Sequence, residues 1–239
     1  MNSRNLSSVL LIASLTLTVS TSAAADDNQR GSFVSILEKL PQTESPINLF
    51  NGKDLAGWTG AEGYWSVEEG VIKGANSDRV SSSTYLFSND SYRDFRLLLE
   101  VRQTLSPKHS TMHSAVAALG ERFTDKGENK HGFRGPLLMF CHDWGIWDAY
   151  RRNRVVPPGE GPKVERKGDW NLIEILVLQN RVRFVANGVL IFDFTDKPEM
   201  LRKSPIGLQI HANDRPQEYR FRGLVLTKSP EDRLITLQQ

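Results

Sequence analysis

Short apolar runs separated by glycine and asparagine turns recur along most of this chain, with almost no helical periodicity between them. The clearest case is residues 181–194, where Asn187-Gly188 separates two apolar runs. An Asn-Gly pair in this position is the strongest short-range signal of a β-hairpin. Many short strands with such turns predict an all-β sandwich of two packed antiparallel sheets. The expected strands are 47–50, 64–67, 71–74, 85–87, 95–102, 115–119, 137–141, 170–178, 181–186, 189–194, 206–211 and 219–226.

The first residues have the layout of a secretory signal peptide. Arg4 precedes an apolar run from Val9 to Val19, and small residues follow up to Ala25. This order matches a leader with a small-residue cleavage site. The apolar run is shorter than the roughly 20 residues that a spanning helix needs. We expect residues 1–25 to be removed, no transmembrane segment to remain, and the protein to be secreted or periplasmic; an uncleaved anchor is the alternative.

The mature chain is expected to form one domain at 46–230, preceded by a polar segment at 26–45 and followed by a tail at 231–239. The polar segment contains one amphipathic piece, 33–40, which fits a short helix or a tether. The single cysteine, Cys141, excludes an internal disulfide, and its apolar neighbours place it in the core. The formal net charge of +2 at pH 7 argues against a nucleic-acid partner, which would require a strongly basic face.

Several motifs follow one another in a fixed order. The stretch 49–58 reads LFNGKDLAGW, 168–171 reads GDWN, and 206–211 reads IGLQIH before Phe221-Arg222. Together these motifs resemble the 3-keto-disaccharide hydrolase family over about residues 46–228. The resemblance implies a concanavalin A-like jelly-roll sandwich and a secreted or periplasmic protein that acts on carbohydrate.

The resemblance also implies a chemistry. In this family the substrate is a glycoside whose sugar carries a ketone at C3, which acidifies the proton at C2. Cleavage by proton abstraction and elimination needs a general base near C2, an acid near the leaving oxygen, and a cation or hydrogen-bond donors at the ketone. No cofactor is certain from the sequence. A divalent cation is compatible with the oxygen-rich stretch 142–148, whereas His109 and His113 lack the helix that a zinc site at their spacing would need.

One strand departs from the family pattern. Typical members carry an acidic strand of the form G-x-E-x-Q-x-x-D, and this chain has residues 135–143, GPLLMFCHD. The Glu and Gln positions are expected at Leu138 and Phe140, so that only Asp143 keeps the acidic character. The closing motif also differs, because Gly223 stands where the family has asparagine.

Four residues are the candidates for catalysis. Gln209 and His211 are two apart on a predicted strand and therefore share a face; a polar pair on an apolar strand is expected to meet the sugar, although His211 could instead simply end its strand. Consecutive residues on a strand point to opposite faces, so His142 and Asp143 share a pocket only if the strand ends, which Gly145 allows. The catalytic candidates are His211, Asp143, His142 and Asp148.

The candidates for substrate binding are aromatic or charged. Trp144 and Trp147 offer flat faces for sugar rings, or else pack in the core or at a sheet edge. Glu100 and Arg102 share a strand face, as a cross-strand structural pair or as part of the sugar-binding sheet. Arg151 or Arg152 could pair with Asp148 for catalysis or form a surface ion pair. The full binding set is Gln209, Trp144, Trp147, Glu100, Arg102, Arg151 and Arg152.

Three functions fit these residues. The prediction is a secreted hydrolase or lyase acting on 3-keto-glycosides or related disaccharides, with a small saccharide as the partner. The alternative is a non-catalytic, lectin-like carbohydrate-binding domain, in which the tryptophans would supply stacking. An ordinary two-carboxylate glycosidase ranks last, because Asp143 and Asp148 are the only obvious pair for it.

Overall fold

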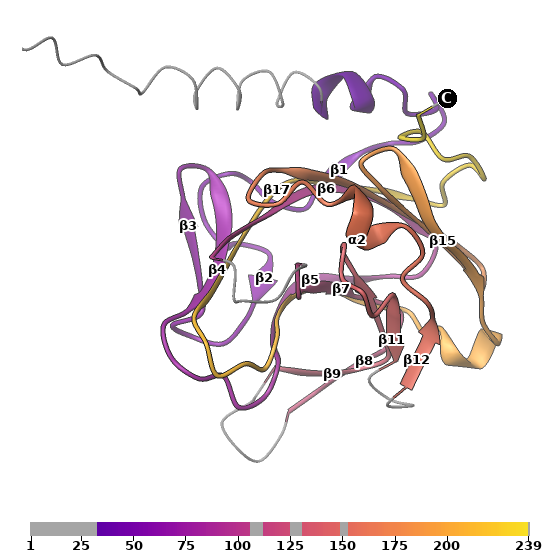
Figure 1. Ribbon diagram of the computed structural model, residues 1–239. Coiled ribbons are helices and arrows are strands. Elements are labelled where there is room, and N and C mark those ends of the chain that lie inside the picture. Colours follow the sequence, from indigo (N-terminus) through magenta and orange to yellow (C-terminus); the bar gives the residue numbers. More distant parts are fainter. Residues whose placement is uncertain (1–32, 106–111, 125–130, 149–152, 239) are drawn as a thin grey trace, which may run out of the picture.

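The computed structural model describes residues 33–105, 112–124, 131–148 and 153–238, and nearly all of its regular structure is β. Two large antiparallel sheets pack face to face (Figure 1), which confirms the predicted β-sandwich. Within the described part of the chain no helix is long and apolar enough to cross a membrane.

Sheet A has eight strands in the order β15-β14-β13-β6-β17-β4-β3, and β1 pairs with β17. Sheet B has seven strands in the order β12-β11-β10-β7-β16-β5-β2. The strands of sheet A are β1 (Ile47–Asn48), β3 (Trp65–Glu68), β4 (Val71–Asn76), β6 (Phe95–Leu105), β13 (Asn171–Leu178), β14 (Arg181–Ala186), β15 (Val189–Thr195) and β17 (Gln217–Lys228). Those of sheet B are β2 (Trp58–Thr59), β5 (Thr84–Tyr92), β7 (Ala115–Ala117), β10 (Pro136–Met139), β11 (Ile146–Asp148), β12 (Asn153–Val156) and β16 (Ser204–Ile210).

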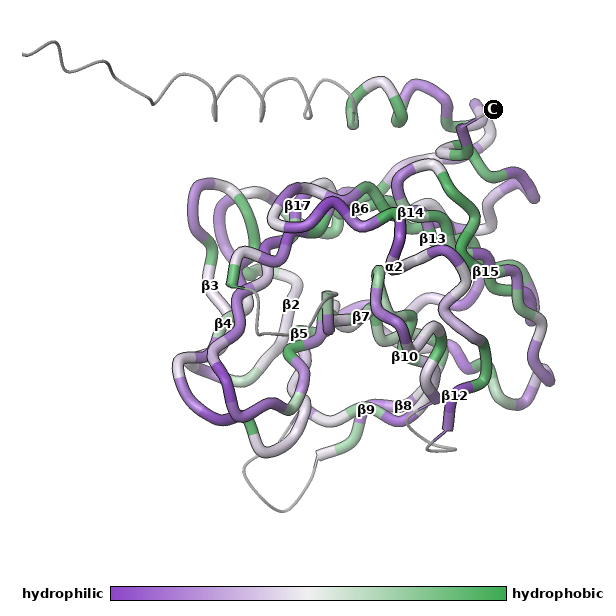
Figure 2. Tube along the Cα trace, in the orientation of Figure 1, coloured by the Kyte–Doolittle hydropathy of each residue, from purple (hydrophilic) through white to green (hydrophobic). Residues whose placement is uncertain are grey.

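The main core lies between the two sheets, because alternate residues of each strand point inward. On β6 the inward residues are Leu97, Leu99 and Val101, and on β16 they are Ile206 and Leu208; all five are fully buried. Figure 2 shows hydrophobic stretches along the strands and hydrophilic ones along many connecting loops. Cys141 belongs to this core, as the sequence predicted.

The predicted hairpin at Asn187-Gly188 is confirmed. Ala186 pairs with Val189, so the two turn residues connect β14 directly to β15. Their φ angles are 49° and 86°, and positive φ at both central residues is what a type I′ turn requires. Asn187 is further held by its side chain, which accepts a hydrogen bond from the Leu172 amide at 3.0 Å.

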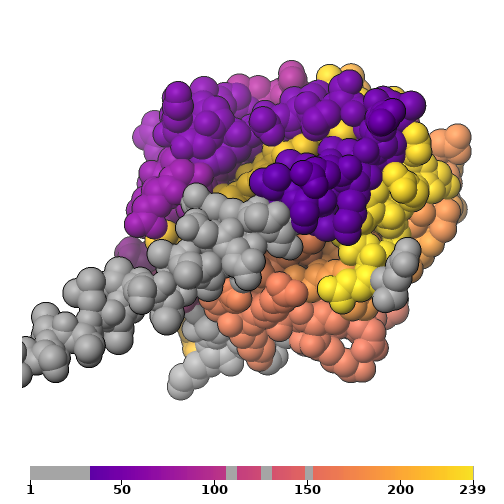
Figure 3. Space-filling model, turned by 90° about the horizontal axis from the view of Figure 1, so that it is seen from above, coloured from indigo at the N-terminus to yellow at the C-terminus, as the bar shows by residue number. Residues whose placement is uncertain are grey.

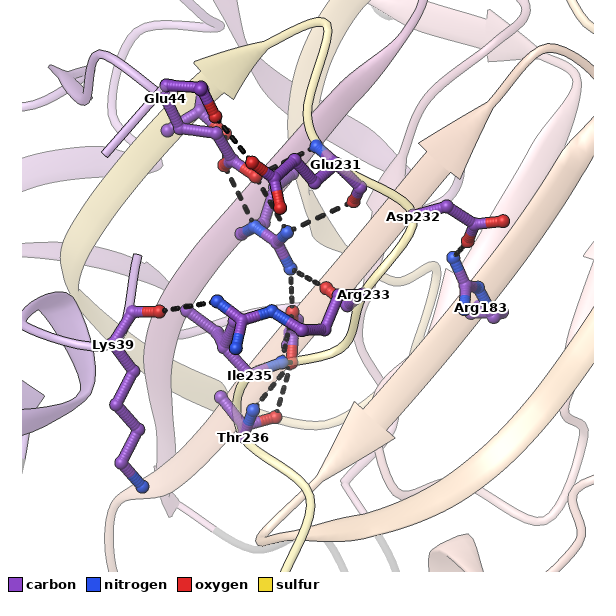
Figure 4. Close-up of polar contacts among 12 residues, drawn as sticks. Lys39, Glu44, Arg183, Glu231, Asp232, Arg233, Ile235 and Thr236 are labelled. Atoms are coloured by element: carbon purple, nitrogen blue, oxygen red, sulfur yellow. Dashed lines mark hydrogen bonds and ion pairs between the residues drawn. The ribbon is translucent and has the colours of Figure 1, made fainter. Parts of the chain in front are cut away.

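Both ends of the described chain cover the outer face of sheet A. Residues 33–37 are helical, and Figure 3 shows this indigo segment close to the yellow C-terminal tail. Beneath them Arg96 is fully buried and donates to Glu44 at 3.1 and 2.8 Å. Arg96 also donates to the tail carbonyl of Arg233 at 2.7 Å and contacts Glu174 (Figure 4). One buried guanidinium therefore ties both terminal segments to the sheet.

The outer face of sheet B is covered by a separate two-stranded hairpin, β8 (Glu121–Phe123) and β9 (Gly132–Arg134). Phe133 of this hairpin lies over Tyr85 and Phe87, with ring centroids 5.9 and 6.2 Å apart. The sequence did not predict these two strands. Much of the outer face of sheet B, on which a sandwich could hold a sugar, is thus filled.

The segment 153–168, which contains none of the strands expected from the sequence, has regular structure. It includes β12 and a short helix, α2 (Gly161–Val164). A further short element, η1 (Pro198–Met200), follows β15. The four residues 149–152, among them the binding candidates Arg151 and Arg152, lie outside the described part of the chain.

Candidate functional site

Three neighbouring strands of sheet B bring three histidines to one end of the sheet. β7 lies between β10 and β16 and is antiparallel to both. The start of β7 therefore lies beside the ends of β10 and β16. His113 precedes β7, while His142 follows β10 and His211 directly follows β16.

The three imidazoles form a stack. The ring centroid of His113 is 3.7 Å from that of His211 and 4.0 Å from that of His142, with interplanar angles of 22° and 26°. Trp144 stands edge-on to all three rings, with centroid distances of 4.9, 5.3 and 5.9 Å. Trp147 lies 5.3 Å from Trp144. We call these five residues the histidine–tryptophan cluster.

A tight turn makes this arrangement possible. β10 ends at Met139, and Gly145, at a φ of 71°, turns the chain into β11. Because the strand has ended, His142 and Asp143 no longer have to point to opposite faces. Nδ1 of His142 lies 2.8 Å from Oδ1 of Asp143. The sequence allowed His142 and Asp143 to lie together only if the strand ended before them, and the structure shows this end and this contact.

Exposure differs across the cluster. His113 and His142 are 7% and 6% exposed, whereas the Asp143 side chain is 62% exposed. His211 and both tryptophans are half-buried. Asp143 thus lies on the exposed side of the cluster, beside the buried ring of His142.

His211 is held by Ser83, which precedes β5 of sheet B, and by Gln217, the first residue of β17 in sheet A. Its Nδ1 lies 3.4 Å from Oγ of Ser83, and its carbonyl accepts a hydrogen bond from Gln217 at 2.8 Å. Gln209 shares the face of His211 as predicted, but it is only 1% exposed and its Nε2 donates to the hydroxyl of Tyr85 at 3.1 Å. Gln209 is therefore buried beside Tyr85 and is not part of the cluster.

Sequence reasoning missed two groups under the cluster. The hydroxyl of Tyr219, from β17, donates to the carbonyl of His113 at 2.9 Å. Glu165 follows α2 and accepts a hydrogen bond from the amide of Met112; burial nevertheless raises the pKa of its carboxyl. A carboxyl of this kind can hold a proton for acid–base work. The position of Glu165 depends on helix α2, and no pattern in the sequence predicted this helix.

The cluster does not form a metal cage. A metal ion lies in the plane of an imidazole, along the nitrogen lone pair, and three rings stacked face to face do not aim their nitrogens at one point. Among the described residues no group of three or more His, Cys, Asp or Glu side chains is arranged to hold a metal ion. The described residues therefore provide no set of ligands for the divalent cation that the sequence analysis considered.

Comparisons with known proteins agree with this fold. Residues 45–227 match the model of the 3-keto-alpha-glucoside-1,2-lyase-like domain. The chain belongs to this family. Its structure is similar to two crystal structures of a proposed glycosyl hydrolase from Parabacteroides distasonis, each with a TM-score of 0.51 over 77% of this chain. These cover 93% and 99% of the solved chains at 20% and 21% identity. A search of curated proteins found no match.

The strand that departs from the family pattern turns its two expected positions away from the outer face. Leu138 and Phe140, the positions expected for the family's Glu and Gln, point into the core between the sheets. Leu137 and Met139 face outward instead, toward Phe133 and the tryptophans. Alternation along β10 decides this, because residues next to one another on a strand face opposite ways. The outward positions of this strand are apolar in this family member.

Asp148 follows Trp147 on β11, but it lies away from the three histidines. It pairs with Pro136 at the start of β10, whereas His142 lies beyond the end of β10. Asp148 is also fully buried. The structure therefore does not bring Asp148 together with Asp143, and the two-carboxylate arrangement does not form.

Glu100 and Arg102 belong to the other sheet. Glu100 pairs across strands with Arg222, whose Nε donates to it at 2.7 Å. The guanidinium of Arg102 lies 4.7 Å from the ring centroid of Trp170. Both residues face outward from sheet A, so neither reaches the histidine–tryptophan cluster.

Proposed function

We propose that this protein is a secreted enzyme that cleaves the glycosidic bond of 3-keto-glycosides or related disaccharides at the histidine–tryptophan cluster. The observation that carries the proposal is the meeting of three histidines and two tryptophans at one end of sheet B. Membership of the 3-keto-alpha-glucoside-1,2-lyase-like family supports the substrate class. The leader at 1–25 supports export.

His142 is the proposed base. A ketone at C3 stabilises negative charge at C2, so an imidazole nitrogen is basic enough to remove the C2 proton. Asp143, 2.8 Å from Nδ1 of His142, would stabilise the imidazolium that forms, as a carboxylate does beside a catalytic histidine. The C2–H electrons then form the enolate of the ketone.

His211 is the proposed acid. As the enolate collapses, a C1–C2 double bond forms, the bond from C1 to the leaving oxygen breaks, and the leaving oxygen takes a proton from His211. Addition of one water across the new double bond gives the free 3-keto sugar, so the net reaction is hydrolysis. The half-buried rings of Trp144 and Trp147 would pack against the apolar face of the sugar.

A second candidate function is carbohydrate binding without turnover. It is favoured by the apolar side chains of Leu137 and Met139 on the strand where the family carries acidic and amide groups. In that case the tryptophans would bind the sugar and no proton would move.

The experiment is to incubate the mature protein with 3-keto-trehalose in D₂O, with and without EDTA, and to follow both sugar release and deuterium at C2. We expect release and exchange, each lowered about 100-fold or more in His142→Ala and His211→Ala, the loss typical of a missing acid or base. His131→Ala, outside the cluster, is the matched control. Tryptophan fluorescence that saturates with sugar while neither release nor exchange occurs would replace the enzyme by the binding function. No response in any of these measurements would reject both.

A further inference from the structure

A recess of about 960 Å³ lies on the outer face of sheet A, on the opposite sheet from the histidine–tryptophan cluster. Its lining includes Phe33 and Lys39 from the N-terminal segment, Arg166 and Trp170 ahead of β13, and the tail from Arg233 to Gln238. Figure 3 looks onto this face and shows the indigo N-terminal segment near the yellow tail. The volume lies at the upper end of the range typical of small-molecule sites, roughly 300–1,000 Å³.

Much of this recess is built from parts of the chain outside the family domain. The family match covers residues 45–227, whereas two of the walls come from residues 33–39 and 233–238. The recess is therefore a feature that this chain adds to the shared sandwich. A ligand in this recess would occupy a different site from a substrate at the histidine–tryptophan cluster.

The added walls are held firmly in place. Glu44 and the carbonyls of Glu231 and Arg233 all accept hydrogen bonds from the buried Arg96. The guanidinium of Arg233 donates to the carbonyl of Lys39 at 3.3 Å and so joins the two walls (Figure 4). The amide of Gln238 donates to the carbonyl of Gly188 at 2.9 Å. A recess with fixed walls is preorganised, which lowers the entropic cost of binding a ligand.

The lining carries an excess of positive charge. Lys39, Arg166 and Arg233 are three cations, and Glu100 is the one acidic residue among the lining residues. Glu100 is already paired with Arg222. Within the described part of the chain, no ion pair joins the ammonium of Lys39 or the guanidinium of Arg166 to an acidic side chain. A recess lined in this way attracts anions.

The remaining residues of the recess are suited to contact a sugar ring. Phe33, Ile36, Leu172 and Leu234 give apolar surface, and the amide side chain of Gln238 can bond hydroxyl groups. The fold of this chain belongs to a carbohydrate-acting family. We propose that the recess binds an acidic saccharide, a sugar whose ring carries a carboxylate or a sulfate ester, with Lys39 and Arg166 as its charge contacts.

Calorimetry on the full mature protein tests this proposal with digalacturonate, a sulfated disaccharide, a neutral disaccharide and inorganic sulfate as probes. We expect saturable binding of the acidic saccharides and at least about tenfold weaker binding in the Lys39→Gln/Arg166→Gln double variant, since two charged contacts are lost. Lys197→Gln/Lys203→Gln removes the same charge elsewhere on the surface and is the matched control, expected to bind as the unmodified protein does.

Three results would overturn the proposal. These are no saturable binding of either acidic saccharide, equal affinity in the Lys39→Gln/Arg166→Gln variant, or inorganic sulfate binding as tightly as the acidic sugars. His211→Ala is expected to leave this binding unchanged, because His211 lies on the other sheet. Loss of binding in His211→Ala would place the ligand at the histidine–tryptophan cluster instead. The test therefore stands apart from the proposed enzymatic function.

Discussion

Replacing Arg96 by methionine is expected to destabilise the protein strongly. The Arg96 side chain is 0% exposed, as is that of Glu174, and that of Glu44 is 1% exposed. The variant keeps similar bulk but leaves two carboxylates buried without a cation. Leaving a buried charge unpaired costs about 3–5 kcal/mol. That is a large fraction of the total stability of a domain, about 5–15 kcal/mol.

Urea unfolding followed by circular dichroism measures this loss. With an m-value of about 2–3 kcal/mol/M for a domain of this size, the midpoint should fall by roughly 1–2 M with m unchanged. Arg181→Met is the matched control. Arg181 pairs with Asp193 at 2.5 Å, but the two side chains are 43% and 34% exposed, so its removal should cost less than about 1 kcal/mol.

A third variant separates charge from packing. In Arg96→Met/Glu44→Gln/Glu174→Gln no uncompensated charge remains, and we expect it to recover part of the lost stability. If Arg96→Met loses no more than Arg181→Met does, water must reach the cluster and the reasoning from buried charge is refuted. If the triple variant is less stable than Arg96→Met, the hydrogen bonds of the two carboxylates to the tail outweigh their burial.

Three further outcomes follow from local features. Burial raises the pKa of the Glu44 carboxyl, but the hydrogen bonds and charge of Arg96 outweigh it and hold this pKa below the ordinary 4.5. Glu44 therefore stabilises the fold fully above pH 4.5, and this stabilisation is lost as the pH falls through the lower pKa of the folded state. Urea midpoints should therefore fall more with decreasing pH in the unmodified protein than in Glu44→Gln. Gly145→Ala should unfold at a lower temperature in calorimetry, since φ is 71° and an added Cβ would lie 2.2 Å from the carbonyl oxygen of Val156; an unchanged midpoint would mean that this turn is mobile. Burial raises the pKa of the Cys141 thiol to about 12, so a thiol reagent should label the protein in denaturant and not in buffer, and rapid native labelling would contradict the buried position.

The two faces of the sandwich have different covers. The outer face of sheet B is covered by the β8–β9 hairpin, and that of sheet A by the two terminal segments. The histidine–tryptophan cluster lies at the end of sheet B, beyond the hairpin strands that cover Tyr85 and Phe87. The two proposed binding regions therefore lie on separate sheets: the histidine–tryptophan cluster at the end of sheet B, and the recess beside the terminal segments on sheet A.

Local features could be predicted from the sequence because their cause is local. The Asn187-Gly188 hairpin follows from the φ angles that these two residues tolerate. The all-β class follows from strand-length apolar runs, and the end of the β10 strand before His142 follows from Gly145. The pairing of His142 with Asp143 needed only that end, so it too was accessible from the sequence.

The assembly of the site was decided by the tertiary structure. His113, His142 and His211 are far apart in the chain, and they meet because β7 lies between β10 and β16 in the sheet. The pairing of β10 with β11 places Asp148 beside Pro136, at the end of β10 away from His142, and the division into two sheets places Glu100 on the other side of the sandwich. Alternation shows which residues of one strand share a face, but which face is covered, and by what, depends on partners distant in sequence.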